Sequence, residues 1–177
     1  MKALKFGILL ALALPGFVHA EQVAQATSPD GRIVVQLDLN SEGRLAYRVL
    51  RDGKPVIADS RLGFILRNDR QLLRNLQLDT QSSSSFDETW EQPWGERRFV
   101  RNHYNELRAD FAEKDRDHRR FSMVFRVFDD GVGFRYDVPK QPKLAEAQIV
   151  QELTEFAVAR PSTAWWIPAY QWNREEY

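Results

Sequence analysis

The stretch FSMVFRVFDDGVGFRYDV, from Phe121 to Val138, decides the fold. Apolar residues alternate with their neighbours on both sides of Asp129-Asp130-Gly131, and a period of two indicates half-buried strands. Asp-Gly between two such runs predicts a hairpin, because glycine adopts positive φ without a steric penalty. The residues predicted to face inward are Phe121, Met123, Phe125, Val127, Val132, Phe134, Tyr136 and Val138. Two strands alone are marginal in water, so further strands must cover this apolar face.

The rest of the chain repeats this pattern in short segments separated by turn sequences. Pro55 predicts an edge position for the strand at 54–58, because proline cannot donate to a ladder. Ser82–Ser85 predicts an exposed loop tip, and Glu21–Thr27 predicts a short polar lead. Only Leu144–Gln151 offers a brief helix as an alternative. Roughly ten short strands predict an all-β fold, a sandwich of antiparallel sheets. The further strand candidates lie at 33–39, 45–49, 62–66, 73–82, 104–111, 149–153 and 156–159.

The N-terminal segment has the pattern of a secretory signal. A start with two lysines precedes the apolar run Phe6–Leu14, and Val18-His19-Ala20 offers small residues at the cleavage positions. The apolar run is too short to span a bilayer, so we predict a signal peptide, Met1–Ala20, and a periplasmic or secreted protein. The alternative, an uncleaved anchor, is disfavoured by the same shortness. Residues 21–177 then form one sandwich domain large enough for a real core.

Composition excludes several classes of function. The predicted mature chain has a formal charge of −2, which gives no electrostatic case for nucleic acid or an anionic membrane. The chain has no cysteine, so disulfides and thiolate zinc sites are excluded. Only His103 and His118 remain after cleavage, which disfavours a metal site built from several histidines.

The C-terminal run WWIPAYQWNREEY is dense in aromatic residues and stops at Tyr177. Domain boundaries usually fall in exposed linkers. We therefore expect the native protein to continue beyond this point. Trp165, Trp166, Tyr170 and Trp172 suit either stacking on a ligand or a core cluster. Glu175 and Glu176 point to opposite faces of any strand, so they do not form a catalytic pair together.

The segment DETWEQPWGE, Asp87–Glu96, combines four carboxylates with Trp90 and Trp94. Tryptophan faces stack on sugar rings and carboxylates accept hydrogen bonds from hydroxyls, so this segment suits a carbohydrate surface. The plainer alternative is a loop whose tryptophans enter the core and whose acids face water, and composition favours it.

Two other groups carry weaker signals. NHYNE, Asn102–Glu106, places His103 among amides and a carboxylate, where it could act as a general base. A lone histidine is more often structural, and no nucleophile motif accompanies it. Asp129-Asp130 could contribute to a Ca²⁺ shell, which needs six to eight oxygens, but beside Gly131 a turn role is favoured.

Several motifs in this order resemble the N-terminal domain of the family-97 glycoside hydrolases, bacterial α-glucosidases and α-galactosidases. They span nearly all of Thr27–Tyr177. The motifs are SPDGRI, RLGF at Arg61–Phe64, ETW and WGE within Glu88–Glu96, RNHYNEL at Arg101–Leu107, FRVFDDGVGFRY at Phe125–Tyr136, and AWW followed by NREEY.

The resemblance implies a galactose mutarotase-like β-super-sandwich followed by a (β/α)₈ barrel that carries the catalytic carboxylates. It implies that this domain walls the substrate pocket for an α-linked oligosaccharide and supplies one glutamate, Glu176, to a Ca²⁺ site in the complete enzyme. Glu175 departs from the aromatic residue expected there. The barrel is absent from this chain, so no catalytic residue is assigned, and one carboxylate alone binds calcium poorly. The substrate-pocket candidates are Trp90, Trp94, Glu96, His103, Asn105 and Glu106.

The leading hypothesis is therefore a carbohydrate-binding-type N-terminal domain of a calcium-dependent α-glycosidase, inactive alone. The alternative is a free-standing periplasmic sugar-binding module. A mutarotase-like enzyme that uses His103 is a third possibility.

Overall fold

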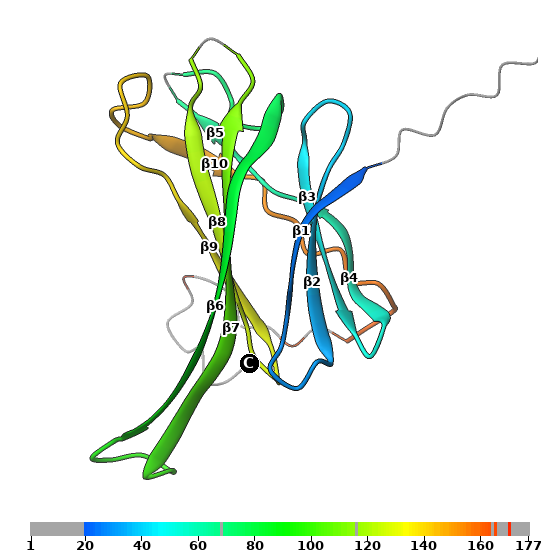
Figure 1. Cartoon of the computed structure of the whole chain (residues 1–177), viewed down its shortest axis with the longest axis vertical. Helices are drawn as coiled ribbons and strands as arrows, with labels where there is room; N and C mark the ends of the chain where they lie inside the picture. Colours follow the sequence, from blue (N-terminus) through cyan, green and yellow to red (C-terminus); the bar gives the residue numbers. More distant parts are fainter. Residues whose placement is uncertain (1–19, 68, 116, 164, 166–169, 171–177) are drawn as a thin grey trace, which may run out of the picture.

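A computed structural model describes residues 20–67, 69–115, 117–163, 165 and 170. The described residues contain ten strands and no helix, as the all-β prediction required (Figure 1). No helix among them could cross a membrane. The strands are β1 (Glu21–Thr27), β2 (Ile33–Leu39), β3 (Leu45–Arg51), β4 (Lys54–Arg61), β5 (Phe64–Leu66), β6 (Leu76–Glu91), β7 (Phe99–Glu113), β8 (Arg120–Val127), β9 (Val132–Asp137) and β10 (Ile149–Glu152).

The first sheet is an antiparallel meander in the order β1-β2-β3-β4. β2 and β3 pair without a register shift from Ile33–Arg51 to Leu39–Leu45, so their apolar side chains share one face. β4 is the outer strand and carries Pro55, so the predicted edge position is confirmed.

The second sheet is the antiparallel meander β6-β7-β8-β9. Phe121–Val138 contains nearly all of β8, a turn and β9, and the two strands pair from Ser122–Asp137 to Val127–Val132. The turn is closed by the Phe128 amide, which donates to the Gly131 carbonyl at 2.8 Å. The predicted hairpin is confirmed.

The core lies between the two sheets. Tyr47 of the first sheet is 1% exposed, and its ring centroid lies 6.1 Å from that of Phe125 and 5.3 Å from that of Phe134 in the second. Val35, Leu37, Leu107 and other inward residues of both meanders join one buried cluster. Two sheets that share one apolar core form the predicted sandwich.

A short pair, β10-β5, lies near the end of the second sheet that carries the start of β6 (Figure 1). The chain after it runs back along β4. The Ala58 amide donates to the Ala157 carbonyl at 2.8 Å, and the Ala159 amide to the Val56 carbonyl at 3.0 Å. The Tyr47 hydroxyl donates to the Glu155 carbonyl at 2.8 Å, which ties this segment to the core.

Three local predictions were wrong. Glu21–Thr27 is strand β1 rather than a polar lead, because its backbone pairs with β2 along its length. Ser82–Ser85 lies within β6, where each serine pairs with a residue of β7. The alternative of a brief helix at Leu144–Gln151 is wrong, and the strand predicted at 149–153 is confirmed as β10.

Candidate functional site

β6 and β7 continue past the rest of their sheet. β8 pairs with β7 only as far as Asn105, whereas β6 stays paired with β7 as far as Phe99. The pairs from Phe86–Tyr104 to Glu91–Phe99 therefore have no third strand in the described part of the chain. At about 3.3 Å per residue, this ribbon extends roughly 20 Å. Residues 86–104 form what we call the arm, drawn in green below the sandwich in Figure 1.

The outer face of the arm, away from the first sheet, is aromatic. In β7 the core-facing residues are odd-numbered, such as Leu107 and Phe111, so Tyr104 and Val100 point outward. Phe86 and Trp90 lie directly opposite them in β6 and share that face. Phe86 stacks on Tyr104 with ring centroids 5.2 Å apart.

Tyr104 anchors the base of the arm from outside the main core. It is 6% exposed, and Phe86, Phe128 and Arg126 contact its ring. The Arg126 guanidinium carbon lies 4.6 Å from the ring centroid, a cation–π distance. Arg126 also donates to Glu106 at 2.8 Å. Phe86 and Trp90 remain 38% and 46% exposed.

Ion pairs between charged side chains stabilise the inner face of the arm. Arg101 donates to both carboxylate oxygens of Asp87, at 2.8 and 2.7 Å, and Arg98 donates to Glu91 at 2.7 Å. The hydrogen bond from Arg101 lowers the pKa of the Asp87 carboxyl. These cross-strand pairs add to the backbone pairing that sets the register of the ribbon.

The tip of the arm, residues 92–98, presents the most exposed aromatic ring of the arm. The Gln92 amide donates to the Arg98 carbonyl at 3.0 Å and closes the turn. Gly95 has φ +119°, which favours glycine there. Trp94 is 82% exposed, and Glu96 is exposed beside it. The alternative that these tryptophans enter the core is wrong.

The six predicted pocket residues do not converge. Trp90, Trp94 and Glu96 lie on the arm or its tip, whereas Asn105 and Glu106 lie at its base on opposite faces of β7. Asn105 donates to the Thr27 carbonyl at 2.8 Å, and Glu106 pairs with Arg126. Their assignment to a substrate pocket stays a prediction.

His103 and the neighbouring turn have structural contacts. The Nδ1 atom of His103 lies 4.0 Å from Asp129 Oδ2. Asp129 Oδ1 accepts a hydrogen bond from the Asp30 amide at 2.8 Å, so it joins two turns at this end of the sandwich. Asp129-Asp130 makes the hairpin turn, as favoured from the sequence. A mutarotase role for His103 stays a prediction without support from these contacts.

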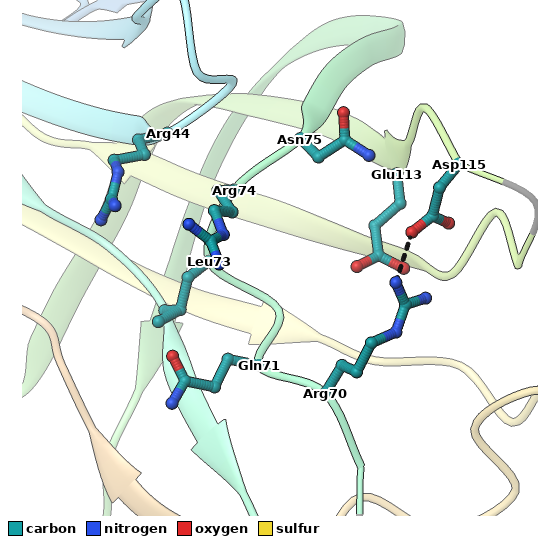
Figure 2. A pocket seen from close by; sticks show the side chains of 8 residues that line it. All are labelled: Arg44, Arg70, Gln71, Leu73, Arg74, Asn75, Glu113 and Asp115. Atoms are coloured by element: carbon teal, nitrogen blue, oxygen red, sulfur yellow. Dashed lines mark hydrogen bonds and ion pairs between the residues drawn. The ribbon is translucent and has the colours of Figure 1, made fainter.

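A polar cavity of about 540 Å³, which the sequence did not suggest, opens at the end of the sandwich away from the arm tip (Figure 2). Its basic residues are largely neutralised. Arg44 pairs with Glu42, and Arg70 donates to Asp115 at 2.8 Å. Its lining comes from the β2–β3 turn, the segment before β6 and the end of β7, so no local spacing could have revealed it. The lining residues are Arg44, Arg70, Gln71, Leu73, Arg74, Asn75, Glu113 and Asp115.

A buried ion pair supports this cavity. Arg119 is 1% exposed and donates to both Glu113 oxygens, at 2.7 and 2.6 Å, and to the Arg70 carbonyl at 2.7 Å. Asp69 lies 3.1 Å from the same guanidinium. Hydrogen bonding to Glu113 raises the pKa of Arg119. These saturated contacts indicate a structural role for the charges.

The predicted calcium ligand, Glu176, lies outside the described residues. Within the described ranges, no group of three or more His, Asp or Glu side chains is placed to hold a metal ion. Ca²⁺ needs six to eight oxygens. The described residues therefore do not fit a calcium site of their own.

The chain is similar to known proteins over nearly its whole length. Residues 26–177 match the family described as Glycosyl-hydrolase 97 N-terminal. A curated relative from Streptomyces bingchenggensis (strain BCW-1), named "Probable retaining alpha-galactosidase", is 30% identical over 184 residues, which cover 98% of this chain and 27% of the relative.

Solved structures give the same picture. A glycoside hydrolase family 97 enzyme from Pseudoalteromonas sp. strain K8, solved in complex with acarbose, aligns with TM-score 0.79 and 40% identity over 87% of this chain and 23% of that chain. A β-arabinopyranosidase aligns with TM-score 0.70 and 26% identity over 77% of this chain and 21% of its own. The chain thus spans about a quarter of the length of the relatives it matches.

Proposed function

The chain belongs to the family of glycosyl hydrolase 97 N-terminal domains, and from that membership we propose that it walls the substrate pocket of a calcium-dependent α-glycosidase without catalysing by itself. The observation that carries the proposal is the match of almost the whole sandwich, at 40% identity, to one quarter of a much longer enzyme. Three-quarters of such an enzyme lies outside this domain. We assign the catalytic carboxylates to that remainder.

The arm tip supports the pocket role. Trp94 and Glu96 stand at the far end of a ribbon that leaves the sandwich, where a neighbouring domain can reach them. A tryptophan face offers a stacking surface for a sugar ring, and a carboxylate accepts its hydroxyl hydrogen bonds. The substrate is an α-linked oligosaccharide, in line with the α-galactosidase name of one relative and the acarbose complex of another.

In this proposal the calcium ion binds at a site shared by this domain and the catalytic domain. One carboxylate from this chain, Glu176, supplies a single oxygen ligand or two, and the catalytic domain supplies the rest of the shell. Export through the predicted signal Met1–Ala20 places the enzyme in the periplasm or outside the cell.

A chimera tests this function. Residues 26–177 replace the matching segment of the Pseudoalteromonas enzyme, and hydrolysis of panose, which a variant of that enzyme binds, is measured with and without a calcium chelator. We expect turnover by the chimera, none by the isolated chain, and a raised calcium requirement in the Glu176→Gln chimera. Turnover by the isolated chain, or a Glu176→Gln chimera with unchanged calcium dependence, would contradict the proposal.

A free-standing sugar-binding module is the second candidate, favoured by the exposure of Trp94. Titration of the isolated chain with maltose or melibiose, followed by tryptophan emission and calorimetry, tests it. A saturable signal that is lost in Trp94→Ala would support this candidate. No signal at millimolar sugar would remove it.

A further inference from the structure

We infer that the outer face of the arm, centred on Phe86 and Trp90, is the docking surface through which this domain seats on the catalytic domain of its enzyme. The inference rests on the proposed function and adds the surface that holds the two domains together. It also gives Trp90 a role different from the substrate contact predicted from sequence.

The arm lacks the packing that ordinarily stabilises a hairpin. A two-stranded ribbon is marginal in water, and here six residue pairs extend beyond the last backbone pair with β8. The sandwich core does not bury large apolar side chains on such a ribbon. Four of them are exposed: Phe86, Trp90, Trp94 and Phe99, at 38, 46, 82 and 58%.

The arrangement of these rings favours a protein partner over a sugar. Tyr104 has its ring already covered by Phe86, Phe128 and Arg126, so it offers little free stacking area. Trp90 lies on the outer face, whereas Phe99 pairs opposite Glu91 on the inner face. Apolar groups on both faces of a narrow ribbon suit enclosure in a groove better than contact with one flat ring.

The arm is also prepared for docking before any partner arrives. Its ion pairs, Asp87 with Arg101 and Glu91 with Arg98, hold the strands in register on the face opposite Trp90. A preformed ribbon reduces the entropy lost on association. In the matched family 97 enzyme about three-quarters of the chain lies outside this domain, and that remainder is the partner that covers the arm.

Trypsin accessibility of the tip measures docking directly. Arg97 and Arg98 are exposed in the tip of the arm, and Lys140 is exposed in a separate loop that serves as an internal reference. The ratio of arm cleavage to Lys140 cleavage is followed by mass spectrometry in the isolated chain and in the chimera described above. We expect the ratio to fall about tenfold or more in the chimera.

Variants identify the face responsible. Trp90→Ala in the chimera should restore arm cleavage by about tenfold, because truncating a buried aromatic anchor at an interface has effects of this size. Val56→Ala is the matched control, since Val56 is exposed to the same degree, 47% against 46%, on the edge of the other sheet. It should leave the ratio unchanged. Neither variant should alter cleavage of the isolated chain.

Each other outcome overturns the inference. Equal arm cleavage in the chimera and the isolated chain would show that nothing covers the arm. Protection of the isolated chain by panose that is lost in Trp90→Ala but kept in Trp94→Ala would assign the outer aromatic face to sugar. An insoluble chimera beside a soluble parent enzyme would show that the two surfaces do not match. A failure of the proposed function appears separately, as protection of the arm with unchanged calcium dependence in Glu176→Gln.

Discussion

Replacing Arg119 by methionine should cost a large part of the stability of this domain. The guanidinium is 1% exposed and donates to both oxygens of Glu113, whose side chain is 4% exposed. The substitution keeps the apolar stem but leaves the Glu113 carboxylate buried without its partner. It also removes a donor from the Arg70 carbonyl.

The size of the effect follows from burial. Breaking one side of a buried ion pair costs about 3–5 kcal/mol, against a total stability of about 5–15 kcal/mol for a typical domain. With a urea slope of about 2 kcal/mol/M, the unfolding midpoint should fall by about 2 M.

Urea unfolding of the mature chain, followed by circular dichroism and tryptophan emission, measures this midpoint. The double variant Glu113→Leu/Arg119→Met removes both charges and should recover most of the loss, because an apolar pair can replace a buried ion pair at little cost. Arg101→Met is the exposed control. Its partner Asp87 is half exposed, and water screens such pairs, so this substitution should change the midpoint little.

Two results would refute this reasoning. If Arg119→Met lowers the midpoint no more than Arg101→Met does, the buried pair adds little beyond an exposed one. If the double variant is as unstable as Arg119→Met, the loss comes from packing or from the Arg70 carbonyl rather than from an unpaired Glu113.

Three further predictions test other parts of the fold. Gly43→Ala should cost about 1–2 kcal/mol or more in the same urea assay, since φ is +67° and the new Cβ would lie 2.5 Å from the Leu76 amide nitrogen; a neutral result would show that the turn can move. Burial raises the pKa of Tyr47 to about 12 from 10.0, so its neutral phenol stabilises the fold fully below pH 10 and loses this effect as pH rises to 12; Tyr47→Phe should flatten the alkaline decline. Hydrogen bonding from Arg61 lowers the pKa of Glu155 to about 2 from 4.5, so stability should be lost as pH falls between these values, and Glu155→Gln should lack that acid-dependent step, as urea midpoints at pH 2.5 and 6 would show.

The sandwich could be predicted because its signals are local. Alternation in Phe121–Val138, with Asp-Gly at the turn, defines both a hairpin and its inward face. Pro55 indicated an edge strand because proline has no amide hydrogen to donate to a second neighbouring strand. The polar cavity could not be predicted in this way, because Arg44 and Arg70 come from segments that only the tertiary fold brings together.

The latter part of strand β6, which leads into the arm, could not be predicted from the sequence, and the reason is physical. Ser82–Ser85 has the composition of a loop, yet it continues a strand whose partner, β7, imposes extended structure through backbone pairing. In the β6 half of the arm, Phe86 and Trp90 gave no strand signal, because no core within the described part of this chain selects an alternating pattern there, whereas the strand predicted to begin at Phe99 and Val100 is confirmed as β7. Local composition agrees with the fold in the core hairpin Phe121–Val138 and departs from it at Glu21–Thr27, at Ser82–Ser85 and in the β6 half of the arm. Such departures are expected at functional surfaces. We therefore expect that contact with a second domain, rather than packing within this one, has selected the exposed aromatic side chains of the arm.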